Sequence, residues 1–251
     1  MASSSLDASR RVDRRLAWDG CFNVRELGGH RTLDGALTRW HAVVRSDARE
    51  RLTESGWSAL RRHGITSIID LRDPTEHSPT LTPVGDIEVI SVPLLDLRDQ
   101  EFWGDGRWRG NDHSTAFYVA VVERWPERLA AAVTQVARAR SGAVLIHCQA
   151  GRDRTGLVAA ALLALVGVGN GAIAEDYSES QRCLQPLYDT WLANASDELE
   201  CERIRRANVS DARVMLELLA TIDLPGRLVE HGLAGADLDR LRRRFVVAPH
   251  I

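Results

Sequence analysis

Cysteine is scarce in this sequence, and its spacing excludes two structural roles. The chain holds 4 cysteines, at positions 21, 148, 183 and 201, with no Cys-x-x-Cys pair and no zinc-ligand spacing. The sequence therefore predicts neither a disulfide framework nor a structural metal, and nothing in it calls for a cofactor. Because unpaired thiols persist in a reducing compartment, we expect a cytoplasmic protein; export without a cleavable leader is left open.

Long apolar runs and a basic excess are also missing. The run 156–168 is too short to span a bilayer, so we expect a buried helix there and no transmembrane segment. Residues 1–20 lack the apolar core of a signal peptide, and the polar stretch 1–15 predicts a flexible tail. The net charge of −3 argues against nucleic acid as a partner.

The sequence does contain enough apolar material for one large domain. Hydrophobic residues make up 44% of the 251 residues and no internal repeat is present, so a single α/β domain over 16–251 is predicted. Short β-branched runs predict strands over 42–46, 65–71, 87–92 and 142–146. Apolar periodicity predicts helices over 53–64, 115–138 with a break at Pro126, 157–168, 172–180, 184–192, 198–206, 212–222 and 238–245.

One stretch between a predicted strand and a predicted helix carries the chemistry. It reads HCQAGRDRTG over 147–156, and such a loop directs backbone N–H groups and the positive end of the helix dipole at an anion. This setting and Arg154 favour the thiolate of Cys148, which makes it a nucleophile. The planar fork of Arg154 holds two phosphoryl oxygens. A lone cysteine beside a strand is usually inert packing, but here the whole pattern favours phosphate chemistry without a metal.

The loop resembles a known family. Its HC-x5-R-T-G pattern resembles the protein tyrosine phosphatase superfamily, and the full string is similar to the bacterial and fungal HC-x-AGKDRTG branch, the mycobacterial phosphatase B type. Here Arg152 replaces the usual lysine. Further matches are the N-x-R-x-LGG opening from Asn23, with Glu26 for the usual aspartate, Arg45-Ser46, and DLR-x-x-x-E over 70–76. The resemblance implies a phosphatase-like α/β fold, with a central mixed, mostly parallel sheet flanked by helices and additional C-terminal helices.

The resemblance also implies roles for the loop residues. Cys148 is the nucleophile, Arg154 stabilises the transferring charge, and Asp153 is the general acid. Phosphate is bound by Gln149, Ala150, Gly151, Arg152, Asp153 and Arg154, with support from His147 and Thr155. Thr155 would donate its hydroxyl to the sulfur or the leaving group. The competing acids are the aspartates at 96, 99, 105 and 112, and the alternative role for Asp153 is to pair with Arg152 or to cap the helix.

The residues and the resemblance leave three candidate functions to compare. The first is a phosphatase acting on phosphotyrosine, and also on phosphoserine or phosphothreonine, through a phosphocysteine intermediate that releases inorganic phosphate. The second is a phosphoinositide phosphatase, which the extra charge of Arg152 favours. The third is a non-catalytic phosphate-binding module, which we would expect to have lost Cys148 or Arg154.

Four other features have two interpretations each. The irregular stretch 93–114, with Trp103 and Trp108, is expected to be a lid, the alternative being a local aromatic core. Asp70 and Arg72 either brace the catalytic loop or tie surface loops together. Tyr177 is expected to be a core residue with a satisfied hydroxyl, the alternative being a direct role in the site. The glycine turns in 22–35 predict a β-hairpin or a pair of tight loops.

Overall fold

The centre of the protein is a five-stranded sheet. We analysed a computed structural model, which describes residues 12–77, 85–104, 106–108, 113–207 and 209–247. The strand order is β1-β3-β6-β4-β5, with β1 antiparallel and the other neighbours parallel. The strands are β1 Arg25–Glu26, β3 Val43–Ser46, β4 Ile65–Asp70, β5 Glu88–Ser91 and β6 Ala143–His147. The expected mixed, mostly parallel sheet is confirmed.

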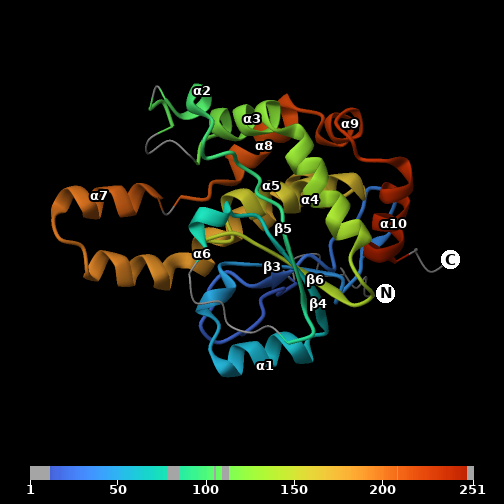
Figure 1. Ribbon diagram of the computed structural model, residues 1–251, viewed down its shortest axis with the longest axis horizontal. Helices are drawn as coiled ribbons and strands as arrows, with labels where there is room; N and C mark the ends of the chain where they lie inside the picture. The colour runs from blue at the N-terminus through green and yellow to red at the C-terminus, as the bar shows by residue number, and fades with distance from the viewer. Residues whose placement is uncertain (1–11, 78–84, 105, 109–112, 208, 248–251) are drawn as a thin grey trace, which may run out of the picture.

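Helices cover both faces of this sheet (Figure 1). Helix α1 Glu54–Arg62 lies on one face, where Trp57 and Leu60 pack against β3, β4 and β6. On the opposite face lie α3 Thr115–Arg124, α4 Pro126–Arg138 and α5 Asp153–Leu165. Pro126 separates α3 from α4, as expected, because proline has no N–H for a helical hydrogen bond. Helix α5 is almost wholly buried, which explains its apolar sequence.

Three parallel strands end side by side. In the pairing register, His147 of β6 lies between Ser46 of β3 and Asp70 of β4. Parallel α/β sheets bind their ligands at the carboxyl ends of the strands. The loop that begins at His147 therefore starts where the topology favours a ligand site.

The C-terminal part is helical, with two differences from expectation. It contains α6 Asn170–Ala193, α7 Glu198–Ala207, α8 Ala212–Thr221, α9 Leu224–Glu230 and α10 Gly235–Phe245. The two helices expected over 172–192 are one continuous helix that passes through Pro186, because Leu184, Leu187 and Tyr188 keep one face buried. Helix α9 was not expected. In Figure 1 the end of α6 and α7 form an arm that extends from the body.

The turn at Asp34-Gly35 joins a short antiparallel hairpin. A bridge links Arg31 to Leu37, the Thr32 N–H donates to the Ala36 carbonyl at 3.0 Å, and the Thr38 N–H donates to the His30 carbonyl at 2.8 Å. The hairpin interpretation of the glycine turns is therefore confirmed. Strand β1 pairs with β3, and strand β2, Leu37–Thr38, also pairs with the C-terminal β7, Val246–Val247.

The aromatic residues of 93–114 form a small core. Helix α2, Gln100–Trp103, brings Phe102 and Trp103 against Phe117 and Trp125, and Trp108 stacks on Phe102 at 5.6 Å. These rings therefore pack on the main core and form the aromatic core of the second interpretation; the lid stays a prediction. Residues 105 and 109–112 lie outside the described part of the chain, as do 1–11 of the expected tail. Among the described helices, none combines the length and apolarity needed to cross a membrane.

Candidate active site

The loop between β6 and α5 forms the candidate site. Strand β6 ends at His147, helix α5 begins at Asp153, and Cys148 lies just beyond the strand with 2% of its surface exposed. The helix N-terminus places the positive end of its dipole at this loop. Strand, cysteine and helix thus stand in the predicted order.

The carbonyl groups of the loop bond to the surrounding protein. The oxygen of Gln149 accepts a hydrogen bond from the Ala48 N–H at 3.0 Å, and that of Ala150 accepts one from Asn23 Nδ2 at 3.0 Å. The Gly151 oxygen accepts one from Arg45 Nη2 at 2.8 Å. These carbonyl groups point away from the centre of the loop, toward the surrounding protein. The N–H groups between them therefore point toward the centre, which we call the bowl of the loop.

Gly151 is required by this geometry. Its φ is +66°, a left-handed conformation that side chains disfavour, and a Cβ here would lie 2.3 Å from the Ser46 carbonyl oxygen. The close approach lets the end of β3 support the loop.

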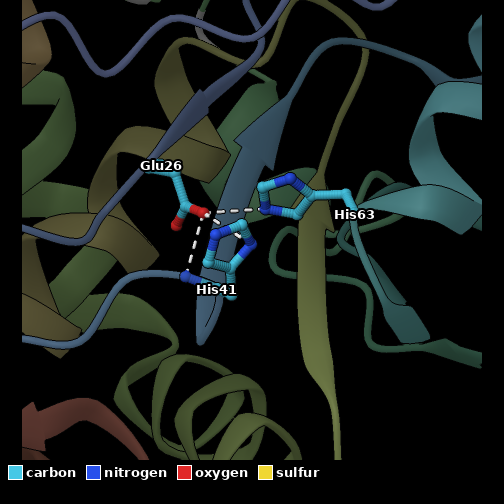
Figure 2. Close-up of side chains that lie close together, drawn as sticks. All are labelled: Glu26, His41 and His63. Atoms are coloured by element: carbon cyan, nitrogen blue, oxygen red, sulfur yellow. Dashed lines mark hydrogen bonds and ion pairs between the residues drawn. The ribbon is translucent and has the colours of Figure 1, made fainter.

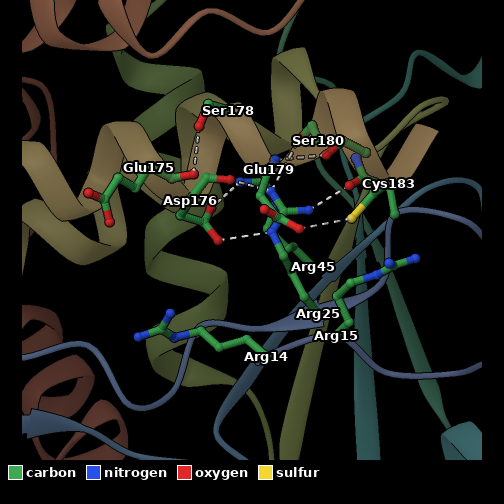
Figure 3. A network of polar contacts seen from close by, with 12 residues as sticks. Arg14, Arg15, Arg25, Arg45, Glu175, Asp176, Ser178, Glu179, Ser180 and Cys183 are labelled. Atoms are coloured by element: carbon green, nitrogen blue, oxygen red, sulfur yellow. Dashed lines mark hydrogen bonds and ion pairs between the residues drawn. The ribbon is translucent and has the colours of Figure 1, made fainter. Parts of the chain in front are cut away.

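A buried ionic network holds the loop against α6 (Figure 3). Asp176 accepts hydrogen bonds from Arg25 Nε at 2.9 Å and Arg45 Nη1 at 2.5 Å, while Arg45 also reaches the loop at Gly151. Burial would raise the pKa of Asp176, but the guanidinium groups of Arg25 and Arg45 hold it well below its usual range. The carboxylate is therefore ionised, and both arginines are fixed.

Arg154 is held by a carboxylate from a distant segment. Its Nη1 and Nη2 donate to Glu76 Oε2 and Oε1 at 2.5 and 2.8 Å. Glu76 also accepts from the Asp73 N–H at 2.9 Å, so its position is fixed by the short helix Pro74–Glu76. Burial opposes the charge of Arg154, but the hydrogen bonds to Glu76 raise its pKa above the usual value. This pair fixes the plane of the guanidinium.

Asp70 and Arg72 brace the start of the loop. Both are buried, and Arg72 Nε and Nη2 donate to the two oxygens of Asp70 at 2.9 and 2.7 Å. Burial would raise the pKa of Asp70, but these bonds lower it to about 2. Asp70 lies 3.5 Å from His147 Nε2, while His147 Nδ1 bonds to the Cys148 carbonyl at 3.1 Å. The contact with His147 favours the bracing interpretation over a surface tie.

His147 suits an orienting role. Burial lowers its pKa from the usual value, so the ring is neutral at neutral pH. A neutral ring whose Nδ1–H donates to the Cys148 carbonyl keeps the first peptide of the loop in place.

The carboxylate of Asp153, at the start of helix α5, is surrounded by hydrogen-bond donors. Its Oδ1 accepts from the Tyr118 hydroxyl at 2.5 Å, from Arg152 Nε at 3.1 Å, and lies 3.1 Å from His113 Nδ1. Burial would raise its pKa, but Arg152 and His113 hold the pKa far below its usual range. Asp153 is therefore an anion in this structure, which both pairs with Arg152 and begins helix α5.

Arg152 directs its charge at protein groups. Its Nη1 donates to the Tyr188 hydroxyl of α6 at 3.1 Å, and its Nη2 lies 2.8 Å from His113 Nδ1. The side chain is buried, and the pair with Asp153 raises the pKa of Arg152 above its usual value despite burial. Its guanidinium thus has several partners within the protein.

The other candidate acids fall into two groups. Asp96 pairs with Arg128 at 2.9 Å, and Asp99 pairs with Arg124 at 2.8 Å while capping α2. Both support the aromatic core of 93–114 and neither touches the loop 147–156 in the described contacts. Asp105 and Asp112 lie outside the described residues.

Comparison with known proteins agrees with this geometry. A model of the tyrosine phosphatase family matches residues 16–247. The chain belongs to the tyrosine phosphatase family. The phosphatase is 30% identical to a triple specificity protein phosphatase of Mycobacterium tuberculosis, over 89% of this chain and 96% of the relative.

Two further relatives support the same family. A putative tyrosine-protein phosphatase of Cupriavidus necator is 30% identical over 71% of this chain and 67% of its own length. A tyrosine-protein phosphatase of Nostoc commune is 32% identical over 57% of this chain and 50% of its own length. The protein is thus a cysteine-dependent phosphatase that acts on phosphorylated substrates, and a non-catalytic phosphate-binding module is not favoured.

Several residues of the phosphatase site were not identified from sequence. His113, Tyr118 and Tyr188 approach the loop from helices or turns far from it in sequence, and no local pattern marks them. Tyr177 was correctly expected to be buried with its hydroxyl satisfied, by Tyr118 at 2.7 Å. Thr155 is buried and its Oγ1 makes no hydrogen bond within the described chain, which leaves the hydroxyl available.

Proposed function

We propose that Cys148 of the phosphatase attacks the phosphorus of a phosphotyrosine monoester in line. The S–P bond forms as the P–O bond to the phenol breaks, which gives a phosphocysteine and a phenol that takes up one proton. The observation that supports this most is the outward orientation of the loop carbonyls, which leaves the N–H groups of Gln149 to Arg154 for the phosphoryl oxygens. Arg154 would hold two of these oxygens.

The second step is hydrolysis of the phosphocysteine. Water attacks phosphorus, the S–P bond breaks, and inorganic phosphate leaves while the thiolate of Cys148 is restored. Thr155 would donate its free hydroxyl to the departing sulfur, because Oγ1 is buried without a partner among the described residues. His147 would orient the loop and take no proton.

We assign the general acid role to Asp153. Its carboxylate is ionised in the empty site, so it must gain a proton when substrate binds. A phosphoryl dianion in the adjacent bowl favours this, since a nearby like charge raises the pKa of a carboxyl. Tyr118 and His113 would then hold the protonated group in position. Asp96 and Asp99 are less suitable because neither touches the loop 147–156 in the described contacts.

The substrate proposal has two parts. Phosphotyrosine in proteins comes first, followed by phosphoserine and phosphothreonine; one relative is named a triple specificity protein phosphatase, which supports more than one kind of substrate. A phosphoinositide is the weaker candidate, since the Arg152 charge that favoured it is engaged by Asp153 and Tyr188. We further propose that the protein is cytoplasmic, and that residues 16–251 form a single domain preceded by a tail over 1–15. Residues 93–114 would move as a lid.

Hydrolysis of p-nitrophenyl phosphate in EDTA is the first test. Activity that persists in EDTA and is absent from Cys148→Ser supports thiolate chemistry without a metal; loss in EDTA contradicts it. Initial rates on phosphotyrosyl, phosphoseryl and phosphothreonyl peptides and on a phosphoinositide headgroup then rank the substrates. A preference for the headgroup would reverse the proposed order.

A further inference from the structure

Three side chains meet at the end of the central sheet that lies opposite the catalytic loop (Figure 2). Glu26 lies on β1, His41 precedes β3, and His63 caps the C-terminus of α1 just before β4. Strands β3 and β4 are parallel, and their last residues lie beside the catalytic loop. The residues just before their first positions therefore lie at the opposite end of the strands. This cluster is therefore separate from the phosphatase site.

Glu26 is a buried carboxylate with an unpaired oxygen. Its side chain is 2% exposed, and its Oε1 accepts from the His41 N–H at 3.0 Å and contacts His63 Nε2 at 2.7 Å. Its Oε2 is buried and has no hydrogen-bond partner within the described chain. The ion pairs of Glu26 among the described residues are with His63 and His41, so its charge is compensated by imidazoles alone. A buried carboxylate with an unsatisfied oxygen is costly.

The donor atoms have the spacing of a metal site. The ligand atoms of Glu26, His41 and His63 all lie within 4.8 Å of one another, with His63 Nε2 2.7 Å and His41 Nδ1 3.9 Å from Oε1. In a tetrahedral zinc site with bonds of about 2.0–2.1 Å, the ligand atoms are about 3.3 Å apart. The two separations measured from Oε1 bracket this value.

We propose that Glu26, His41 and His63 bind one divalent transition-metal ion, with Zn²⁺ as the best fit. Two imidazoles and one carboxylate are a common protein ligand set for zinc, and water completes the shell. The ion, bound through Oε1, gives the buried Glu26 carboxylate a positive partner and links the edge strand β1 to the turn before β3 and to the end of α1. His41 is 67% exposed, which leaves an open side through which the ion enters.

The placement of His41 supports this role. Its φ is +56°, and it is the non-glycine residue with a positive φ among those described. From this position its ring lies beside Glu26 and is tilted against that of His63, with ring centroids 4.5 Å apart. No sequence pattern indicates this site, because its three residues are far apart in the chain and follow no metal-ligand spacing.

Zn²⁺ titration of the full-length, tag-free chain tests the proposal. The Cys148→Ser background removes the catalytic thiolate as a competing ligand. We expect one Zn²⁺ per chain by calorimetry and a rise in Tm with added Zn²⁺, because a ligand that binds only the folded state stabilises it. His41→Asn tolerates the left-handed backbone and should weaken binding at least about tenfold, with no change in the Tm of the metal-free protein. His231→Asn, on an exposed histidine of the α9 end, should bind as the parent does.

Three results would overturn the site. The first is no saturable Zn²⁺ binding; the second is equal affinity in His41→Asn and its parent. The third is a Co²⁺ derivative whose spectrum carries a thiolate charge-transfer band, which places the ion on a cysteine. If binding is absent, the cluster is a plain imidazole–carboxylate ion pair, and the phosphatase assay in EDTA is unaffected by that outcome.

Discussion

Arg154 and Glu76 form a two-point ion pair across 78 residues of sequence, with hydrogen bonds of 2.5 and 2.8 Å. Glu76 belongs to the DLR-x-x-x-E segment, and its own position is set by the capping box of Asp73. A guanidinium held in this way keeps its plane when the phosphoryl charge moves, which reduces the reorganisation needed in the transition state. The pair thus joins two motifs that the sequence separates.

We expect Glu76→Gln to lower kcat/KM about tenfold to a hundredfold, because the loss of a positioning contact misplaces Arg154 without removing it. The measurement is steady-state kinetics on p-nitrophenyl phosphate. Glu88→Gln is the matched control, since Glu88 lies on the outer strand β5 with its side chain 44% exposed. Equal kcat/KM for Glu76→Gln and the parent would show that Arg154 needs no such support.

Cys148→Ser should abolish turnover and keep substrate binding. A serine hydroxyl in the same loop is a far weaker nucleophile than a thiolate, but the N–H groups and Arg154 remain. Calorimetry with a phosphotyrosyl peptide should give a Kd within a few-fold of the parent KM. Serine at Cys183 provides the comparison, because that buried thiol lies on α6 and away from the loop. Residual turnover at the parental rate would remove Cys148 from the mechanism.

Asp153→Asn should lower kcat on a phosphotyrosyl peptide about a hundredfold and affect p-nitrophenyl phosphate much less, because p-nitrophenolate leaves without a proton. A general acid acts when protonated, so the parent kcat should fall on the alkaline side as Asp153 ionises in the complex. This alkaline limb should disappear in the variant. Asp96→Asn should keep it; if the limb vanishes there instead, the acid lies in the stretch 93–114.

Asp176→Asn should destabilise the protein by about 3–5 kcal/mol, because two buried arginines lose their counter-charge. The pKa of Asp176 is lowered in the folded state, so its contribution is complete above the unfolded pKa of about 3.9 and is lost as pH falls below it. Urea unfolding from pH 7 downward should show a smaller acid loss in the variant. Asp189→Asn, exposed on the same helix, should match the parent; a parental acid loss in Asp176→Asn contradicts the assignment.

Local patterns were sufficient for most of the helices and strands of the sheet and for the catalytic loop. The strand before His147 and the helix after Asp153 were predicted from β-branched and apolar runs, because such signals are contained in neighbouring residues. The break at Pro126 was predicted for the same reason. The continuous α6 was not, because burial of Tyr188 and its neighbours outweighs the local penalty of Pro186.

The sequence alone determined the catalytic loop and the family, since the nucleophile, the arginine and the glycine lie within one short stretch and are recognised without reference to remote residues. Only the tertiary structure decided which groups hold that loop: Glu76 on Arg154, Asp176 on Arg45, and Tyr118 on Asp153. It also brought Glu26 to His41 and His63. The physical reason is that ion pairs and metal ligands depend on distances of a few ångströms in space, which the folding of distant segments sets and sequence spacing does not.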